Sequence, residues 1–572
     1  MNPKEKSYDE MAIGIVERFF KEVRVDPAIE SSIKDIILEK VNRKSYGRYE
    51  MCFASKTDGN KLNGVVQNRI KGFFELSGIT IDDFSIRKVT PREFNIIASD
   101  LSNFLGMELG YSIGDSSKPE EYVPALCDHA KDRRASDIHI FPPEKDEKDN
   151  YLAQIKLRID GILQPTDRLD PGGFEKVIRH LHRQIPNVKE GEAVIEGGFE
   201  MKETPGVTYR LSSMFMENSR TKLNKGSGYC TTIRVLKADK PELSLKQLGY
   251  LQHDENKVQD LIKERSGVIL ATGETGSGKT TTIMSLANGI QKKYEGGKKI
   301  MTLEDPVEYE LRGVQQFTVH KDDDKGKKLT FENGLSSILR QDPDVIVVGE
   351  VRTRQTAHDV FNLAHTGHLV LATMHSDTAT GALSRLAEWG ISGALMNSCL
   401  KGIISQYLIR ATCKMCINPE EQKHLTEEQA RYLFRQPNEI NDEDYSKFLQ
   451  DAMKLPIKYG SGFTRGEVCP KCEGLKYYDR IPIVQIFKNR PEHYHIVSAI
   501  AKGEPDAPKK MIELFQEGKY TSFALNALFH IMIGNTTPEE VINYLPPSCF
   551  EDYGAVLTRN AKRIMEKKEV RG

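Results

Sequence analysis

The sequence lacks an excess of charge of either sign. Its 81 lysine and arginine residues are balanced by 82 aspartate and glutamate residues, so the formal net charge is −1. A protein that binds nucleic acid or anionic lipid through its overall field needs a large positive charge. The composition argues against this kind of binding, and we expect no nucleic-acid partner.

Long hydrophobic runs are also missing. No apolar stretch approaches the ~18 residues of a membrane-spanning helix. The N-terminus, Met-Asn-Pro-Lys-Glu-Lys, carries both signs of charge instead of a signal-peptide apolar core. We therefore expect a cytoplasmic protein. With 572 residues, 38% of them hydrophobic and 28% charged, the chain has an ordinary soluble composition and is long enough for several domains.

Cysteine is sparse and odd in number, with nine residues in the whole chain. Four form two Cys-x-x-Cys pairs, Cys413 with Cys416 and Cys469 with Cys472. In a reducing compartment such pairs indicate a metal, and four thiolates suit a tetrahedral Zn²⁺ site. The charged, amphipathic segment 417–468 that separates them suggests an inserted helical module, and it is longer than usual for one zinc ribbon. Free or redox-active cysteines are the alternative.

The most informative stretch is 267–282, where an apolar run, a glycine-rich turn and a helix-forming segment follow one another. Gly273–Thr280 fills the phosphate-loop pattern G-x-x-x-x-G-K-[ST]. Its backbone N–H groups, with the helix dipole behind them, suit phosphate oxygens. Lys279 is expected to reach the β- and γ-phosphates and Thr280 to bind Mg²⁺. A glycine turn without a ligand is the alternative. The expected nucleotide-binding residues are Gly273, Glu274, Thr275, Gly276, Ser277, Gly278, Lys279, Thr280, Thr281 and Glu304.

From Ser244 to about Ile409, apolar strands alternate with helical segments. This alternation implies a parallel sheet covered by helices on both faces, with ligands at the carboxyl ends of the strands. The predicted strands are 267–272, 299–304, 344–350 and 368–375, and the predicted helices are 279–294, 331–340 and about 354–365.

Chemically active side chains stand at the ends of these strands. Glu304, Asp305 and Glu308 cluster after 299–304, where their repulsion calls for a cation or a proton. Glu350 ends the strand 344–350 and is expected to act on Mg²⁺ or its water. A solvated acidic turn is the alternative for the first group, and a chance acidic strand end is the alternative for Glu350. His368 and His375 begin and end strand 368–375, and their spacing predicts opposite faces, which argues against one shared metal. Buried core histidines are the alternative there.

The upstream part of the chain carries weaker signals. Apolar residues recur at helical spacing from Met11 to Val23, which predicts an amphipathic helix that either packs in a small domain or docks to a partner or membrane. Alternation over 153–161 ends in Asp-Gly, which predicts a hairpin. Arg210 and Arg234 lie in similar alternating stretches, and taken alone such arginines indicate solvated strand faces.

Together these residues resemble the secretion ATPase family, which comprises type II secretion ATPases, type IV pilus assembly and retraction ATPases, and conjugative relatives. The resemblance covers roughly 120–550. Its motifs are an N-terminal signature (Ala135–Ile140 with Arg158–Gly161), an aspartate box (Glu304–Tyr309), an atypical Walker B segment (Leu339–Glu350) and a histidine box (Gly367–His375).

The resemblance implies an α/β fold with a RecA-like P-loop ATPase core, a PAS-like α+β N-terminal domain, an extra N-terminal region and a zinc-knuckle insertion. The expected domains are 1–115, a helical or α+β partner-docking region; 116–240, the PAS-like domain; 241–410, the RecA-like domain; 411–480, the tetracysteine zinc module; and 481–572, a C-terminal helical region.

The resemblance also implies residue roles in a homohexamer that binds ATP between two domains. Glu308 would orient the attacking water, and Glu350 would act on Mg²⁺ through a water molecule. His368 and His375 would sense the γ-phosphate and the cleft, and Lys279 completes the catalytic set. Arg210 and Arg234 fall where the family's N-terminal domain supplies arginines to the phosphates. Asp137 and His139 are expected to hold their domain together.

Type II secretion and pilus assembly ATPases usually carry the tetracysteine pattern. The resemblance therefore favours an ATP-driven motor, peripheral to the inner membrane, for type IV pilus assembly or type II secretion. Its partners would be a platform protein in the inner membrane and associated cytoplasmic or bitopic assembly proteins. A conjugation-related or DNA-translocating motor and a non-catalytic nucleotide-switched scaffold are the alternatives. The chain departs from the family pattern at Thr353, commonly Asp, in the long basic segment 214–228, and in the loosely matching region 1–115.

Overall fold

The structure is a computed structural model. It describes three strands upstream of residue 118 and then residues 118–550, apart from 146–150, 187, 189–191, 217–227, 238–243, 309, 320–328, 417–421, 434–445, 447–448, 451–452, 455–456, 459–468, 470, 473–474 and 517–519. The amphipathic helix predicted for Met11–Val23 lies outside the described residues. The three upstream strands, β1 (Ile36–Lys40), β2 (Arg48–Phe53) and β3 (Asp83–Lys88), form a sheet in which β2 pairs antiparallel with β1 and parallel with β3.

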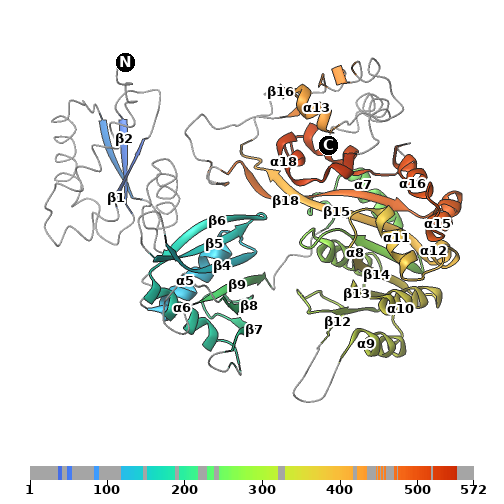
Figure 1. Ribbon diagram of the computed structural model, residues 1–572, viewed down its shortest axis with the longest axis horizontal. Helices are drawn as coiled ribbons and strands as arrows, with labels where there is room; N and C mark the ends of the chain where they lie inside the picture. Colours follow the sequence, from blue (N-terminus) through green and yellow to red (C-terminus); the bar gives the residue numbers. More distant parts are fainter. Residues whose placement is uncertain are drawn as a thin grey trace. The chain divides into compact units, whose positions relative to one another are not determined.

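A six-stranded sheet with two helices follows, which agrees with the α+β expectation (Figure 1). The strands on either side of Asp160–Gly161 are neighbours in this sheet, and the two turn residues have φ values of 50° and 90°, so the predicted hairpin is confirmed. The strand order is β6-β5-β4-β9-β8-β7. The elements are α5 (Pro119–Asp132), β4 (Asp137–Lys145), β5 (Tyr151–Ile159), β6 (Ile162–Leu169), α6 (Pro171–Arg183), β7 (Val194–Glu200), β8 (Val207–Phe215) and β9 (Tyr229–Lys237).

The main sheet has seven strands in the order β12-β11-β13-β14-β10-β15-β18. Every pairing is parallel except that of β15 with β18. The seventh strand comes from beyond residue 410, so the sheet continues past the predicted RecA-like segment. The strands are β10 (Gly267–Thr272), β11 (Ile300–Glu304), β12 (Val314–Thr318), β13 (Val345–Val351), β14 (Leu369–Met374), β15 (Leu400–Thr412) and β18 (Tyr477–Lys488).

Helices cover both faces of this sheet, as the alternating pattern predicts. Successive residues of β10 enter different cores: Val268 and Leu270 join one hydrophobic cluster, and Ile269 and Ala271 join the other. The helices before and between these strands are α7 (Gln252–Leu261), α8 (Lys279–Lys293), α9 (Phe331–Ile338) with the 3₁₀ turn η1 (Leu339–Gln341), α10 (Arg354–His365), α11 (Ala379–Glu388) and α12 (Gly393–Cys399).

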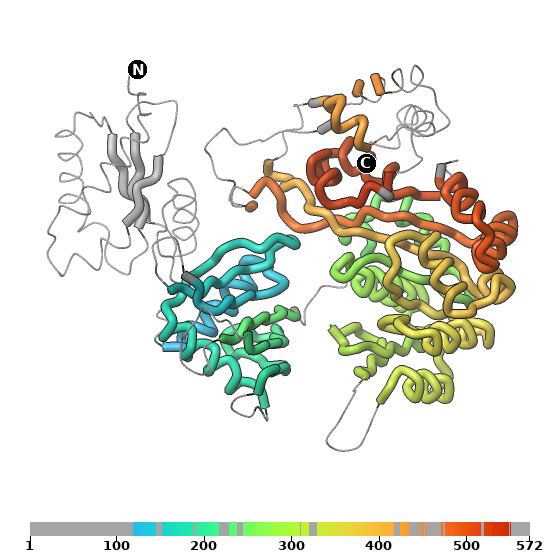
Figure 2. Tube along the Cα trace, viewed as in Figure 1, coloured from blue at the N-terminus to red at the C-terminus, as the bar shows by residue number. Residues whose placement is uncertain are grey.

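The C-terminal part is helical after β18, with η2 (Pro491–His493), α15 (Tyr494–Ala501), α16 (Ala507–Gln516), α17 (Phe523–Met532), α18 (Pro538–Tyr544) and η3 (Pro547–Phe550). Between β15 and β18 lies the cysteine-containing insertion, with β16 (Gln422–Lys423), α13 (Glu427–Leu433) and β17 (Ile457–Lys458). Figure 2 follows β15 and β18 side by side as a long antiparallel pair.

The predicted strands agree with the structure to within one residue, and this one residue places the two histidines just outside their predicted strand. β14 spans Leu369–Met374, so His368 precedes the strand and His375 follows it. They therefore flank the two ends of β14 instead of beginning and ending it, so the alternation along the strand does not determine which faces they occupy.

Candidate nucleotide site

The glycine-rich loop joins the end of β10 to the start of α8. Gly278 is the N-cap of α8 in a left-handed conformation (φ 84°, ψ 15°), and Gly273 has φ 146°. A Cβ on Gly273 would lie 2.3 Å from the carbonyl oxygen of Gln406, so only glycine fits there. The loop thus presents its backbone at the N-terminus of a 15-residue helix, an arrangement suited to anions.

Lys279, the first residue of α8, is buried beside the loop. Its Nζ donates to the carbonyl oxygens of Gly273 (2.9 Å) and Glu274 (2.7 Å). Burial lowers the pKa of Lys279, and the carboxylates of Glu350 and Glu274 oppose this shift. The ammonium group is therefore held at the loop, on the side where a bound phosphate would need a positive charge.

Glu350 lies in a β-bulge near the end of β13. The pairing of β13 with β14 shifts register between Val348 and Val351, which places Glu350 in the irregular segment. A bulge re-aims side chains that would otherwise follow the pleat. Gly349 leaves little room here, because a Cβ would lie 3.1 Å from Leu303 O and from Glu304 Cα of the neighbouring β11, which would have to move slightly.

Both carboxylate oxygens of Glu350 have basic partners. His375 Nε2 lies 2.9 Å from Oε1, and Arg352 Nη2 lies 2.6 Å from Oε2. A second guanidinium nitrogen of Arg352 is 3.8 Å from Asp305 Oδ2. The hydrogen bond to Glu350 raises the pKa of Arg352. The ends of β11, β13 and β14 therefore converge on one polar cluster of Asp305, Glu350, Arg352 and His375.

The two glutamates of the predicted acidic turn have different surroundings. Glu304 is 3% exposed and accepts hydrogen bonds from Thr302 Oγ1 (2.6 Å) and Gln316 Nε2 (3.1 Å). Burial raises the pKa of Glu304, against the effect of these two donors. Glu308, in contrast, is exposed. Glu304 is thus a partnered buried carboxyl, whereas Glu308 is accessible to a water molecule or an ion.

His368 is not brought to this cluster by its own sheet. Its Nδ1 lies 3.1 Å from Leu363 O and 3.1 Å from Thr366 Oγ1. The next residue, Leu369, pairs with Gly267 at the start of β10, whereas the phosphate loop follows the end of that strand. His368 therefore occupies the opposite edge of the sheet from His375.

The departure at Thr353 has a structural explanation. Thr353 is the N-cap of α10, and its Oγ1 accepts a hydrogen bond from the backbone N–H of Thr356 (3.2 Å). Asp and Thr are both favoured N-caps, because each places a side-chain oxygen on an unpaired N–H of the first turn. Thr353 therefore performs the capping role that an Asp would have at this position.

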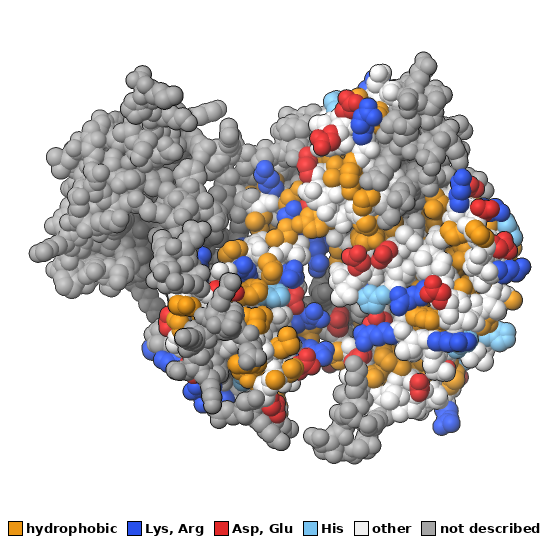
Figure 3. All heavy atoms as spheres, in the orientation of Figure 1, with side chains coloured by type: hydrophobic (Ala, Val, Ile, Leu, Met, Phe, Trp, Pro, Cys, Tyr) orange, Lys and Arg blue, Asp and Glu red, His pale blue; other side chains and the backbone are white. Residues whose placement is uncertain are grey.

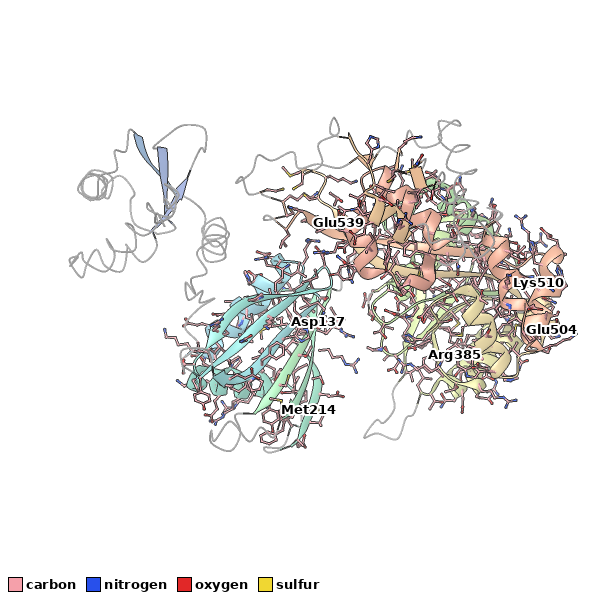
Figure 4. All side chains as sticks on the ribbon, turned by 45° about the horizontal axis from the view of Figure 1, so that its top comes forward. Asp137, Met214, Arg385, Glu504, Lys510 and Glu539 are labelled. Carbon is pink, nitrogen blue, oxygen red and sulfur yellow. The ribbon has the colours of Figure 1, made fainter. Side chains whose placement is uncertain are left out.

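In the six-stranded sheet, Arg210 and Arg234 are directly opposite each other on β8 and β9. Arg234 is in turn opposite Asp137 on β4, whose Oδ1 lies 3.2 Å from Arg234 Nε (Asp137 is labelled in Figure 4). Asp137 also lies 3.9 Å from Arg158 Nε. His139 Nδ1 contacts Thr232 Oγ1 at 3.2 Å. Both arginines are exposed on one face, where their like charges are opposite each other and the Asp137 carboxylate already partners Arg234.

The four cysteines of the two Cys-x-x-Cys pairs form one buried cluster. Their Sγ atoms all lie within 4.8 Å of one another, with Cys413 and Cys469 at 3.8 Å and Cys416 and Cys472 at 3.4 Å. Zn–S bonds of about 2.3 Å in a tetrahedron place sulfur atoms about 3.8 Å apart. The donor set and its spacing fit one zinc ion shared by both pairs.

Two residues near the site were not predicted from the sequence. They are Arg352, a member of the cluster, and Gln406, which contacts the phosphate loop. Arg352 could have been found from its place two residues after the acid that ends a strand. Gln406 gives no such signal, because a lone glutamine in an apolar strand indicates nothing by itself.

The glycine-rich loop and the cluster around Glu350 lie at the carboxyl ends of the parallel strands of the main sheet. Together with the strand order, they define a P-loop ATPase with a RecA-like core. The family model for "Type II/IV secretion system protein" matches residues 114–542, so the chain belongs to this family of secretion ATPases.

Two relatives illustrate the similarity. The chain is 31% identical to "Type II secretion system protein E" of Dickeya dadantii, over 73% of this chain and 74% of that protein. It is 30% identical to "Type IV pilus assembly ATPase PilB" of Thermus thermophilus, over 75% of this chain but only 43% of that longer protein. The crystal structure of the ATPase DotB from Legionella pneumophila is similar in fold, with a TM-score of 0.50 at 18% identity over 73% of this chain and 94% of that one.

Among the helices that the structure describes, none combines the length and apolar character needed to cross a membrane.

Proposed function

We propose that the chain hydrolyses ATP at the carboxyl edge of the main sheet, with the phosphates on Gly273–Thr280. The observation that carries this proposal is the placement of this loop and the Glu350 cluster on the same edge. Lys279 would bind the β- and γ-phosphates. Thr280, and Glu350 through a water molecule, would hold Mg²⁺, which would neutralise charge on the transferred phosphoryl group. The remaining loop residues, Glu274, Thr275, Ser277 and Thr281 among them, would line the phosphates.

Glu308 would orient the attacking water. Its exposure supports this role, because a general base must reach solvent or substrate. Glu304 would help to position Glu308 indirectly. Its carboxyl group accepts hydrogen bonds from Thr302 and Gln316, and these bonds would fix the backbone at the end of β11. His375, held on Glu350, would report the state of the γ-phosphate to the end of β14.

The second domain would complete the site. Arg210 and Arg234 are opposite each other on the neighbouring strands β8 and β9, with Asp137 beside Arg234, and two exposed guanidinium groups at one place suit an anionic phosphate. His368 lies at the end of the strands opposite to the phosphate loop, so it would act at a contact with a neighbouring subunit or in the cleft between domains. Closure of the arginine-bearing domain over the nucleotide would then gate hydrolysis.

At the level of the cell, we propose a homohexameric ring that drives type IV pilus assembly or type II secretion from the cytoplasmic side of the inner membrane. It would act through a platform protein in that membrane and associated assembly proteins. The names of the relatives support this role. A suitable test replaces the chromosomal gene with one encoding Lys279→Ala. The proposal expects loss of surface pili or of secreted protein at normal protein level, and full export in that strain would contradict it.

A DNA-translocating motor is the second candidate. The described surface argues against it, because acidic and basic side chains are interspersed on the face that Figure 3 shows. Phosphate release measured with and without duplex DNA separates the two. We expect no stimulation, and a strong, salt-sensitive stimulation would favour the DNA motor.

We propose that Cys413, Cys416, Cys469 and Cys472 bind one structural Zn²⁺. The residues fit because all four thiols are buried and converge from both ends of the insertion. Elemental analysis should give one zinc per chain. The Cys413→Ser, Cys472→Ser double variant should lose the metal and unfold at a lower temperature, and unchanged stability without zinc would contradict this assignment.

A further inference from the structure

Gln406 lies on β15 directly beneath the phosphate loop. Thr272, the last residue of β10, pairs with Ser405, and their hydroxyl oxygens are 2.7 Å apart. Gln406 is the next residue along β15, just beyond the point where β10 gives way to the loop. Its side chain is almost fully buried, at 1% exposure.

The Gln406 side chain makes hydrogen bonds with three partners. Its Nε2 donates to the carbonyl oxygen of Ser277 (2.6 Å). Its Oε1 accepts from Thr282 Oγ1 (2.9 Å), in the first turn of α8, and from Tyr250 Oη (3.1 Å). The amide orientation is determined by these partners, since the reverse orientation would place Oε1 against the Ser277 carbonyl, a second acceptor.

Two glycines of the loop lie so close to Gln406 that a side chain on either would contact it. A Cβ on Gly273 would lie 2.3 Å from the Gln406 backbone oxygen, and a Cβ on Gly278 would lie 3.1 Å from Gln406 Nε2. The loop therefore packs on β15 at Gln406 through both backbone and side chain. A substitution at Gln406 would leave Ser277 O and two hydroxyl groups without this shared partner.

We propose that Gln406 is a positioning residue for the nucleoside triphosphate, and that it acts through the phosphate loop. In a planar trans peptide the C=O and the following N–H point in opposite directions. Since Gln406 draws the Ser277 carbonyl toward β15, it turns the N–H of Gly278 away from β15, toward the side where phosphate would bind. Its hydrogen bond with Thr282 also holds the first turn of α8 in place relative to the loop.

This role predicts an effect on nucleotide affinity more than on the chemical step. The loop would bind phosphate in the ground state and in the transition state alike, so its loosening should raise KM with kcat nearly unchanged. Loss of two or three hydrogen bonds in the Gln406→Leu variant should raise KM for ATP about tenfold or more. Gln406→Glu keeps an acceptor but loses the donor to Ser277, so its KM should rise as well.

Gln485 provides a matched control, because it is a buried glutamine on the adjacent strand β18. It is 6% exposed, and its Oε1 accepts a hydrogen bond from the N–H of Ala379 at the start of α11 (2.8 Å), not from the loop. Gln485→Leu should lower the melting temperature in the same way while KM stays within about twofold of wild type.

The experiment measures KM, kcat and melting temperature for the full chain and its Gln406→Leu, Gln406→Glu and Gln485→Leu variants, with ATP as the varied ligand. A KM for Gln406→Leu no higher than that of Gln485→Leu, at similar loss of stability, would overturn the proposal. If Gln406→Leu does not fold, Tyr250→Phe removes one donor from the same network. It should raise KM by about two- to fivefold, and an unchanged KM would also overturn the proposal. Wild-type turnover in the same assay separates this outcome from a failure to hydrolyse ATP.

Discussion

His530 is a completely buried histidine on α17. Its Nδ1 accepts from Asn535 Nδ2 (3.1 Å), and Nε2 has no partner among the described residues. Burial lowers the pKa of His530 from 6.5 to about 4. The folded protein therefore keeps the imidazole neutral where the unfolded chain binds a proton. Between pH 4 and 6.5 the unfolded state holds more protons at this residue, so the contribution of His530 to stability falls as the pH decreases through this window.

We predict that His530→Gln makes the stability of this domain less dependent on pH. Each pH unit within the window is worth up to about 1.4 kcal/mol per proton, so the slope of the unfolding free energy should decrease by up to that amount. Urea unfolding of wild type and variant between pH 4.5 and 7.5 measures the slope. Parallel slopes for the two proteins would show that His530 titrates normally in the folded state.

At the scale of elements, the bulge in β13 connects packing to chemistry. β13 and β11 approach so closely at Gly349 that the site of a Cβ is already in contact with backbone atoms of Leu303 and Glu304. Backbone atoms cannot rotate away as a side chain would. The same bulge aims Glu350 at His375 and Arg352. The spacing of two strands thus determines where the carboxylate lies.

We expect Gly349→Ala to push β11 away from β13. Overpacking of this kind costs typically about 1–3 kcal/mol, and the carboxylate of Glu350 would be displaced with the strand. The variant should therefore lose both melting temperature and ATP turnover. Gly503→Ala is a suitable control for turnover, because a Cβ there has nothing within 4 Å and the position is strained only by its φ of 73°. Normal turnover in Gly349→Ala would refute the link between strand spacing and Glu350.

The elements of the ATPase core could be predicted from sequence because apolar runs and helical periodicity are local signals. β10 and α10 match their predicted ranges, and β11 and β13 differ by one residue at an end. The bulge at Gly349–Glu350 could not be predicted, since it depends on the approach of another strand. The same holds for Gln406, whose partners Tyr250, Ser277 and Thr282 lie far from it along the chain, and for β18, which joins the sheet from beyond the cysteine insertion.

The hexamer, the domain boundaries and the site roles remain predictions at the scale of the whole molecule. These features depend on contacts between domains and between subunits, and local residue patterns do not predict such contacts directly. The sequence does place two arginines, Arg210 and Arg234, opposite each other on an exposed sheet face, where a phosphate could reach both.

We predict that Arg210→Ala lowers kcat without lowering stability. Removal of one of two facing positive charges relieves repulsion in the isolated domain, whereas loss of an arginine that reaches the phosphates costs about 10³–10⁵ in rate. Ser212→Ala, two residues along the same exposed face of β8, is the control and should retain wild-type kcat. A loss of kcat equal in both variants would indicate general damage to the sheet instead.

The most direct test is phosphate release by the assembled full chain with Glu350→Gln, measured beside binding of a fluorescent ATP analogue. Asp344→Asn is the matched control. Asp344 directly precedes the first residue of β13, away from the Glu350 end of the strand, and its carboxylate pairs with Lys298 (2.6 Å). We expect Glu350→Gln to bind ATP normally and to lose about 10²-fold or more in turnover, while Asp344→Asn keeps its turnover. Turnover of Glu350→Gln equal to wild type would contradict the proposed ATPase mechanism.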